Sequence, residues 1–137
     1  MRAAILDTNV YIDFWERKLH KEMLATIHAA FVVRSSAVVL SELRRGARSQ
    51  QARRTVEGLF RHTVDIWEPT PADWWEAGKL VREIGDARSW DINKRREFQN
   101  DALVALTARG KGALLVTSNR ADFEKLERRV GIRIEYL

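Results

Sequence analysis

The chain alternates short apolar runs with longer stretches in which apolar residues recur at helical spacing. The short runs are typical of buried strands, and they occur at residues 3–6, 31–33, 64–67, 113–117 and 132–136. Apolar residues three, four and seven positions apart predict amphipathic helices, and this pattern covers residues 19–30, 49–61, 70–84 and 121–129. Two further helices are expected, one from a cap at Ser36 to Gly46 and a long one that follows a loop at 85–90 and stops at 110–112.

Strands separated by helical stretches predict an α/β domain with a mainly parallel sheet. No repeat, low-complexity tract or linker interrupts the pattern, so we expect a single domain over residues 1–137. Ligands of open α/β sheets bind beyond the carboxyl ends of the strands. Asp7, Asn119 and Asp122 all lie just past predicted strands, and they are therefore candidates for a site.

Four acidic residues are embedded in, or lie directly beside, segments expected to form the core. Asp7 follows the first apolar run, Glu42 and Asp101 lie within apolar stretches of two predicted helices, and Asp122 lies shortly after residues 114–117. Burying a charge without a partner costs several kcal/mol, so this placement indicates a shared buried site. A divalent cation such as Mg²⁺ or Mn²⁺ is the simplest partner for it, because these hard ions prefer oxygen ligands.

Each of these acids also has an ordinary explanation. Asp7 can cap a helix that begins near Thr8, and Glu42 can pair with Arg45 one turn further on. Asp101 can be a charge on a helix surface, and Asp122 can cap the helix that follows it. The residues alone leave these alternatives open.

Composition narrows the class of protein. The 24 Lys and Arg residues exceed the 19 Asp and Glu residues, and the net charge of +5 favours an anionic partner, nucleic acid before an anionic membrane surface. A solvated basic surface without a partner is the alternative. The absence of cysteine excludes disulfides, thiol catalysis and zinc–thiolate sites, and the absence of a phosphate-cradling glycine loop disfavours an NTPase.

Targeting signals are not evident. The N-terminal apolar run is shorter than the roughly 7–15 residues of a signal-peptide core, and no window approaches the roughly 20 apolar residues that span a bilayer. We therefore expect a cytoplasmic protein that does not bind membranes.

Four segments match, in order and in spacing, the motifs of a known family: Ile5–Val10, Ser41–Gly46, Asn100–Ala105 and Val116–Phe123. In these segments the chain resembles PIN-domain ribonucleases, specifically the VapC-type toxins of bacterial and archaeal toxin–antitoxin pairs. The resemblance implies a three-layer α/β/α domain whose five-stranded, mainly parallel sheet has the order 3-2-1-4-5. It also implies a Mg²⁺-dependent endoribonuclease, with Mn²⁺ as a substitute, that cleaves RNA phosphodiester bonds with a metal-activated water.

The resemblance assigns roles to residues. Asp7 and Asp101 would be direct metal ligands, Glu42 would help to hold the metal or orient the water, and Asp122 or Asn119 would complete the catalytic set. Many relatives have an acid where this chain has Asn119, and an amide binds metal more weakly than a carboxylate. Three hydroxyl residues are candidates to donate hydrogen bonds to the ligands: Thr8, Ser41 and Thr117.

The resemblance also implies an RNA substrate, a cognate antitoxin and a homodimer. Basic residues near the acids are expected to bind RNA phosphates on either side of the cut; they are Arg44, Arg45, Arg48, Lys94 and Arg95. Tyr11, Phe14 and Trp15 share one helical face, which is either core or a groove for a partner, and Tyr11 and Trp15 are the candidates for contact with the antitoxin.

Other classes of function remain open. The chain could be a PIN nuclease of RNA processing that is not a toxin, or a degenerate PIN domain that binds RNA or protein as a scaffold. Phosphatases of the haloacid dehalogenase type need a second Asp two residues after the first, and this chain has Asn9 there.

Overall fold

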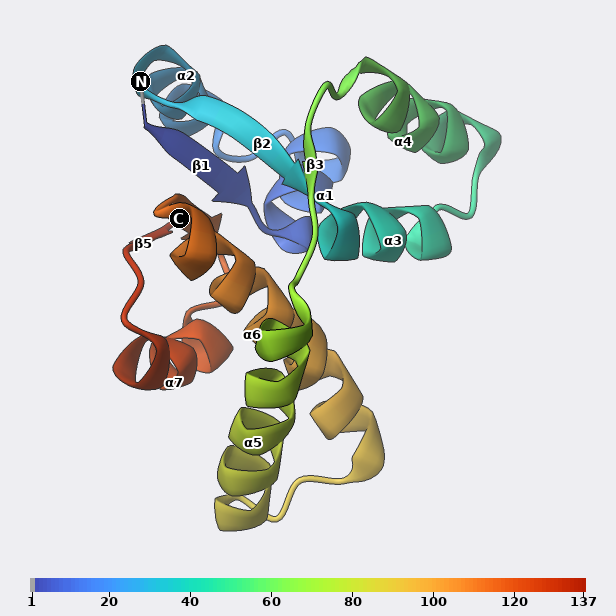
Figure 1. Ribbon diagram of the computed structural model, residues 1–137. Coiled ribbons are helices and arrows are strands. Elements are labelled where there is room, and N and C mark those ends of the chain that lie inside the picture. The colour runs from blue at the N-terminus through green and yellow to red at the C-terminus, as the bar shows by residue number, and fades with distance from the viewer. Residues whose placement is uncertain (1) are drawn as a thin grey trace.

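The computed structural model describes residues 2–137, with a five-stranded sheet at its centre (Figure 1). Its strands have the order β3-β2-β1-β4-β5, and every neighbouring pair is parallel. The bounds are β1 Ala3–Leu6, β2 Val32–Ser36, β3 Ile66–Trp67, β4 Leu114–Thr117 and β5 Ile134–Tyr136. The predicted α/β class and strand order are therefore confirmed.

Seven helices connect the strands within residues 2–137. Figure 1 shows α5 and α6 side by side, projecting away from the sheet, with α4 at the opposite end of the molecule. The bounds are α1 Thr8–Arg17, α2 Lys21–Ala30, α3 Ala37–Gly46, α4 Gln50–His62, α5 Pro71–Ala87, α6 Ile92–Lys111 and α7 Arg120–Val130. None of the helices in this part of the chain is long and apolar enough to cross a membrane.

Successive side chains of a strand point to opposite faces of the sheet, and helices cover both faces. Ile5 of β1 packs into a large cluster with residues of α3 to α7, whereas its neighbours Ala4 and Leu6 pack with Val10 of α1 and with α2. These two cores make the three-layer arrangement. Each fully buried apolar side chain contributes about 1.5–3 kcal/mol, and the residues with no exposed surface include Phe98, Leu103, Leu106 and Leu115.

Local chemistry explains where several elements begin and end. The Ser36 hydroxyl accepts a hydrogen bond from the Val39 amide, so Ser36 caps α3 as predicted. Thr70 and Asp73 form a capping box at the start of α5, with Pro71 at the first helical position. Gly112 ends α6 with a positive φ of 61°, a conformation that glycine adopts without strain.

Several predicted boundaries were wrong; the strand expected at 31–33, for example, is Val32–Ser36. The strand expected at 64–67 is only Ile66–Trp67, because Val64 is 91% exposed and has no sheet neighbour to pack on. The loop expected to begin at Gly85 begins after Ala87 instead. A Cβ at Gly85 would lie 2.9 Å from the Arg95 guanidinium, so glycine at this helical position permits α6 to approach closely.

Candidate active site

Asp7 lies where β1 ends, at the carboxyl edge of the sheet beside the end of its parallel neighbour β4. Its side chain is buried, and one carboxylate oxygen accepts a 2.9 Å hydrogen bond from the Thr117 hydroxyl. Asp7 occupies the N-cap position of α1, but its side chain makes no capping hydrogen bond. The carboxylate is therefore not explained by helix capping.

Glu42 projects from α3 toward the same edge and is half-buried. Its two oxygens accept hydrogen bonds from the Thr8 hydroxyl at 2.8 Å and from the Asn100 amide at 3.4 Å. Within residues 2–137 no ion pair joins it to Arg45, the alternative suggested by the sequence. Two neutral donors thus fix Glu42 and leave its charge uncompensated.

Asp101 is presented by the middle of α6, one residue after Asn100. Burial raises the pKa of its carboxyl well above the usual value, and the charges of Asp7, Asp122 and Glu42 raise it further, while Lys94 lowers it. These charges act on Asp101 only because the fold brings all four acids to one place. Asp7, Glu42, Asp101 and Asp122 therefore lie in one neighbourhood of the fold.

Asp122 is held differently from the other three acids. One of its oxygens accepts hydrogen bonds from the Lys94 ammonium at 2.6 Å and from the Asn119 amide at 3.2 Å, and the other lies 3.9 Å from the Lys125 ammonium. The cap of α7 is Asn119, whose side-chain oxygen accepts from the Asp122 amide. Asp122 is thus not the capping residue, and its charge is compensated by lysine.

Asp7 carries an electrostatic cost at neutral pH. Its pKa is raised to about 6, first by burial and to a lesser extent by the charge of Glu42, although hydrogen bonds from the Thr117 side chain and the Thr8 backbone lower it. A site that gathers carboxylates in this way disfavours their charged forms and attracts cations.

The carboxylate oxygens of the site suit a hard divalent ion, although they do not surround a metal position completely. Within residues 2–137, no three His, Cys, Asp or Glu side chains lie close enough to hold a metal between them. Mg²⁺ usually binds through one or two carboxylates and keeps several waters. Asp7, which is buried, and Asp101, which is half-buried, satisfy that requirement, and neither forms a direct ion pair within residues 2–137.

The predicted hydroxyl donors have different surroundings. Thr8 donates to Glu42 and Thr117 donates to Asp7. Ser41 is exposed and lines a cavity of about 310 Å³ beside Glu42. Asn100, to which the sequence assigned no role, is the second donor to Glu42, and its place directly before Asp101 was the available signal.

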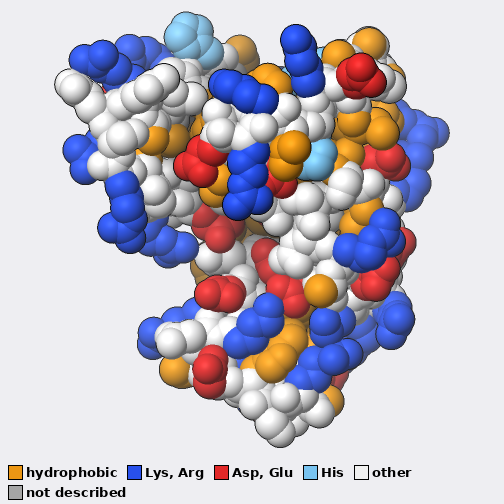
Figure 2. All heavy atoms as spheres, turned by 180° about the vertical axis from the view of Figure 1, so that it is seen from behind, with side chains coloured by type: hydrophobic (Ala, Val, Ile, Leu, Met, Phe, Trp, Pro, Cys, Tyr) orange, Lys and Arg blue, Asp and Glu red, His pale blue; other side chains and the backbone are white. Residues whose placement is uncertain are grey.

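The basic residues divide into those that line the cavity beside Glu42 and those that lie outside it. Arg45 lines a cavity of about 290 Å³ together with Glu42, Arg96 and Asn100. Figure 2 shows Asp and Glu side chains gathered at a hollow in the waist of the molecule, with Lys and Arg side chains above and below. The remaining candidates lie outside this cavity. Arg44 lines a groove between α3 and α4, and Arg48 is exposed near the end of α3. Lys94 forms an ion pair with Asp122, and Arg95 forms an ion pair with Asp86 and donates a hydrogen bond to the Trp90 carbonyl.

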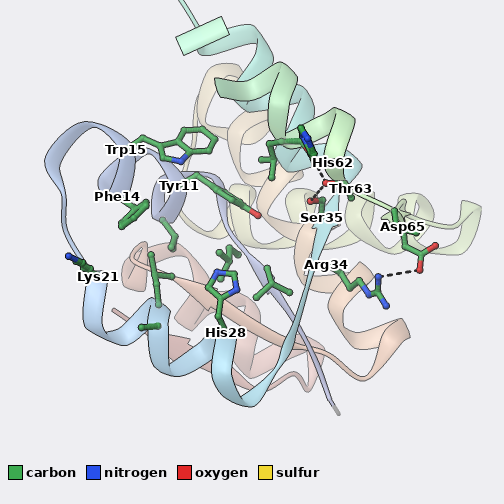
Figure 3. Close-up of a pocket in the computed structure, with 17 residues that line it drawn as sticks. Tyr11, Phe14, Trp15, Lys21, His28, Arg34, Ser35, His62, Thr63 and Asp65 are labelled. Carbon is green, nitrogen blue, oxygen red and sulfur yellow. Dashed lines mark hydrogen bonds and ion pairs between the residues drawn. The ribbon is translucent and has the colours of Figure 1, made fainter. Parts of the chain in front are cut away.

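A separate apolar groove lies between α1, α2, β2 and α4, with a volume of about 640 Å³. Figure 3 shows Tyr11, Phe14 and Trp15 of α1 along one side of it, with His28 of α2 opposite. The rings of Tyr11 and Trp15 lie 5.3 Å apart, and both pack partly against the core. The two aromatic candidates therefore serve the core with one part of their surface and the groove with another.

The PIN domain family model matches residues 4–129, and the chain belongs to this family. PIN domains are nucleases, which places the chain among hydrolases that act on nucleic acids. No curated protein shows significant sequence similarity to it.

Solved structures share the fold over the whole chain. A chain of VapBC2 from Rickettsia felis, bound to a DNA fragment from their promoter, is 21% identical with a TM-score of 0.70, covering 98% of each chain. A chain of VapBC-1 from nontypeable Haemophilus influenzae has 22% sequence identity and a TM-score of 0.70, and the match covers 98% of this chain and 97% of that one. A third match is a chain of VapBC-5 from Mycobacterium tuberculosis, a member of the VapBC family of toxin-antitoxin systems. It has 20% sequence identity and a TM-score of 0.60, and the match covers 100% of both chains.

Proposed function

We propose that this protein is a Mg²⁺-dependent endoribonuclease and the toxin of a VapBC-type toxin–antitoxin pair. The observation that carries the proposal is the approach of three acids to Asp101, one from the end of β1, one from α3 and one from α7. Membership of the PIN family supports nuclease activity, and the similarity to chains of VapBC complexes supports the pairing with an antitoxin.

Asp7 and Asp101 would hold the ion, and Glu42 would complete its surroundings through bound water. When bound, the ion would neutralise charge on the scissile phosphate and lower the pKa of a water. Thr117 fixes Asp7, while Thr8 and Asn100 fix Glu42, so that both carboxylates face the site in one orientation. Arg45 and Arg96 would bind phosphates next to the cut.

The antitoxin would bind the apolar groove of Figure 3 through Tyr11 and Trp15. Lys21 also lines this groove, and Arg34 does so while paired with Asp65 at 3.3 Å, so a partner segment with apolar anchors and an acidic residue near Lys21 would be complementary. Trp74 and Trp75 are adjacent on α5 and are 51% and 86% exposed, and one of them would lie in the contact of the proposed homodimer.

The test is cleavage of structured RNA by the purified protein with Mg²⁺, compared with EDTA. Cleavage should require Mg²⁺ and should fall by at least about a hundredfold in Asp7→Asn and Asp101→Asn. Glu16→Gln, which changes an exposed carboxylate on α1, is the matched control and should cleave like wild type. Cleavage that persists in EDTA would refute the metal dependence, and inactivity of the wild type with Mg²⁺ would favour a binding module.

A further inference from the structure

Lys94 is an unusual residue at its position in the fold. It lies in the first turn of α6, where the Asp91 side chain accepts from its backbone amide at 2.8 Å. A cation in the first turn of a helix is disfavoured by the helix dipole. Its side chain nevertheless crosses to α7 and meets Asp122, 28 residues further along the chain, at 2.6 Å.

The ammonium of Lys94 is held on more than one side. It lies 5.2 Å from the centre of the Trp90 ring, and Trp90 in turn packs edge-on against the fully buried Phe98. The side chain of Lys94 is 32% exposed and that of Asp122 is 11% exposed, so the pair is largely shielded from water. Lysine is therefore fixed at the acidic site rather than extended into solvent.

Three of the four carboxylates accept hydrogen bonds from other side chains, and these three differ in what compensates their charge. Asp122 has two ammonium neighbours and an amide donor. Asp7 accepts from a neutral hydroxyl of Thr117, and Glu42 accepts from a neutral hydroxyl and a neutral amide. A divalent ion gains most from carboxylates that have no cation of their own.

We propose that Lys94 is a built-in cation that neutralises Asp122, so that the acidic cluster accepts one divalent ion rather than two. The ion is held from the side of Asp7 and Asp101, and Asp122 positions Lys94 instead of binding metal. This inference rests on the proposed function for the presence of an ion, and it goes beyond that function by fixing the number of ions and assigning Lys94 and Asp122 to each other.

The experiment is calorimetric titration of the RNA-free protein with Mn²⁺. Wild type should bind one ion per chain. Lys94→Met keeps an unbranched, slightly shorter side chain and removes the ammonium that contacts both Asp122 and the Trp90 ring, and it should bind two. Lys94→Met combined with Asp122→Asn should return to one. Lys125→Met, which removes an equivalent charge 3.9 Å from the same carboxylate, is the matched control and should stay at one.

Asp122→Asn alone gives an independent measurement if the Lys94 variant does not fold. Its affinity for Mn²⁺ should change by less than about threefold, because Asp122 is not a ligand, whereas loss of a direct ligand would weaken binding by at least about tenfold. Two ions in wild type, one ion in Lys94→Met, or a tenfold loss in Asp122→Asn would overturn the inference. A wild type that binds one ion but does not cleave RNA would overturn the proposed function and leave this inference standing.

Discussion

Replacing Asp7 with Asn should stabilise the metal-free protein. The pKa of Asp7 rises from an ordinary value of 3.8 to about 6 on folding, and each pKa unit corresponds to about 1.4 kcal/mol. Ionised Asp7 therefore costs the folded state about 3 kcal/mol, and this cost disappears in Asp7→Asn, whose side-chain oxygen can still accept from Thr117.

The direction of the pH dependence follows from the raised pKa. Between pH 3.8 and about 6 the folded protein retains a proton on Asp7 that the unfolded chain has lost, so this contribution to stability falls as the pH rises. The stability difference between Asp7→Asn and wild type should be near zero below about pH 3, about half complete near pH 5 and about 3 kcal/mol above about pH 7.

Urea denaturation in EDTA, followed by circular dichroism at several pH values, measures this difference. Glu16→Gln on the same helix should stay within about 0.5 kcal/mol of wild type at every pH, because its carboxylate is exposed. Saturating Mg²⁺ should stabilise wild type selectively and narrow the gap, by about 2.7 kcal/mol at a hundred times the Kd. A gap that does not grow with pH, or a wild type more stable than Asp7→Asn at pH 8 in EDTA, would refute the reasoning.

Three further changes test other parts of the molecule. Arg45→Ala with Arg96→Ala should weaken RNA binding and lower the slope of log affinity against log salt by about 1–2; an unchanged slope in filter-binding assays would remove these residues from the RNA path. Trp15→Ala should weaken antitoxin binding by at least about tenfold in a calorimetric titration, and equal affinity would place the antitoxin elsewhere. Leu103→Ala should lower the free energy of unfolding by about 2–5 kcal/mol, because Leu103 has no exposed surface; a loss under 1 kcal/mol in urea would contradict the packing described.

The sequence was most informative for features that depend on the order of residues within one helix or strand. The strand order and class were predictable because apolar runs alternate with amphipathic stretches, and Asp7 could be located because it directly follows a buried strand. The position of Glu42 beside the buried face of its helix could likewise be predicted from the apolar residues around it.

Contacts between distant segments were not predictable in the same way. The hydrogen bond from Asn100 to Glu42 spans 58 residues and the pair of Lys94 with Asp122 spans 28, and no local pattern encodes either partner. Lys94 and Arg95 were interpreted as residues facing RNA because they are basic and near Asp101, whereas the structure engages them with Asp122 and Asp86. Charge type is visible in a sequence, but the partner of a charge depends on the packing of α6 against α5 and α7.

The hydrogen bond between Thr117 and Asp7 joins residues 110 positions apart. During synthesis from the N-terminus, Asp7, the first carboxylate of the site, is made long before the Thr117 hydroxyl that positions it. A ribosome that has not yet passed the strand containing Thr117 carries a chain whose acids have no common centre. The acidic site is therefore completed only after the segment that carries Thr117 has been synthesised.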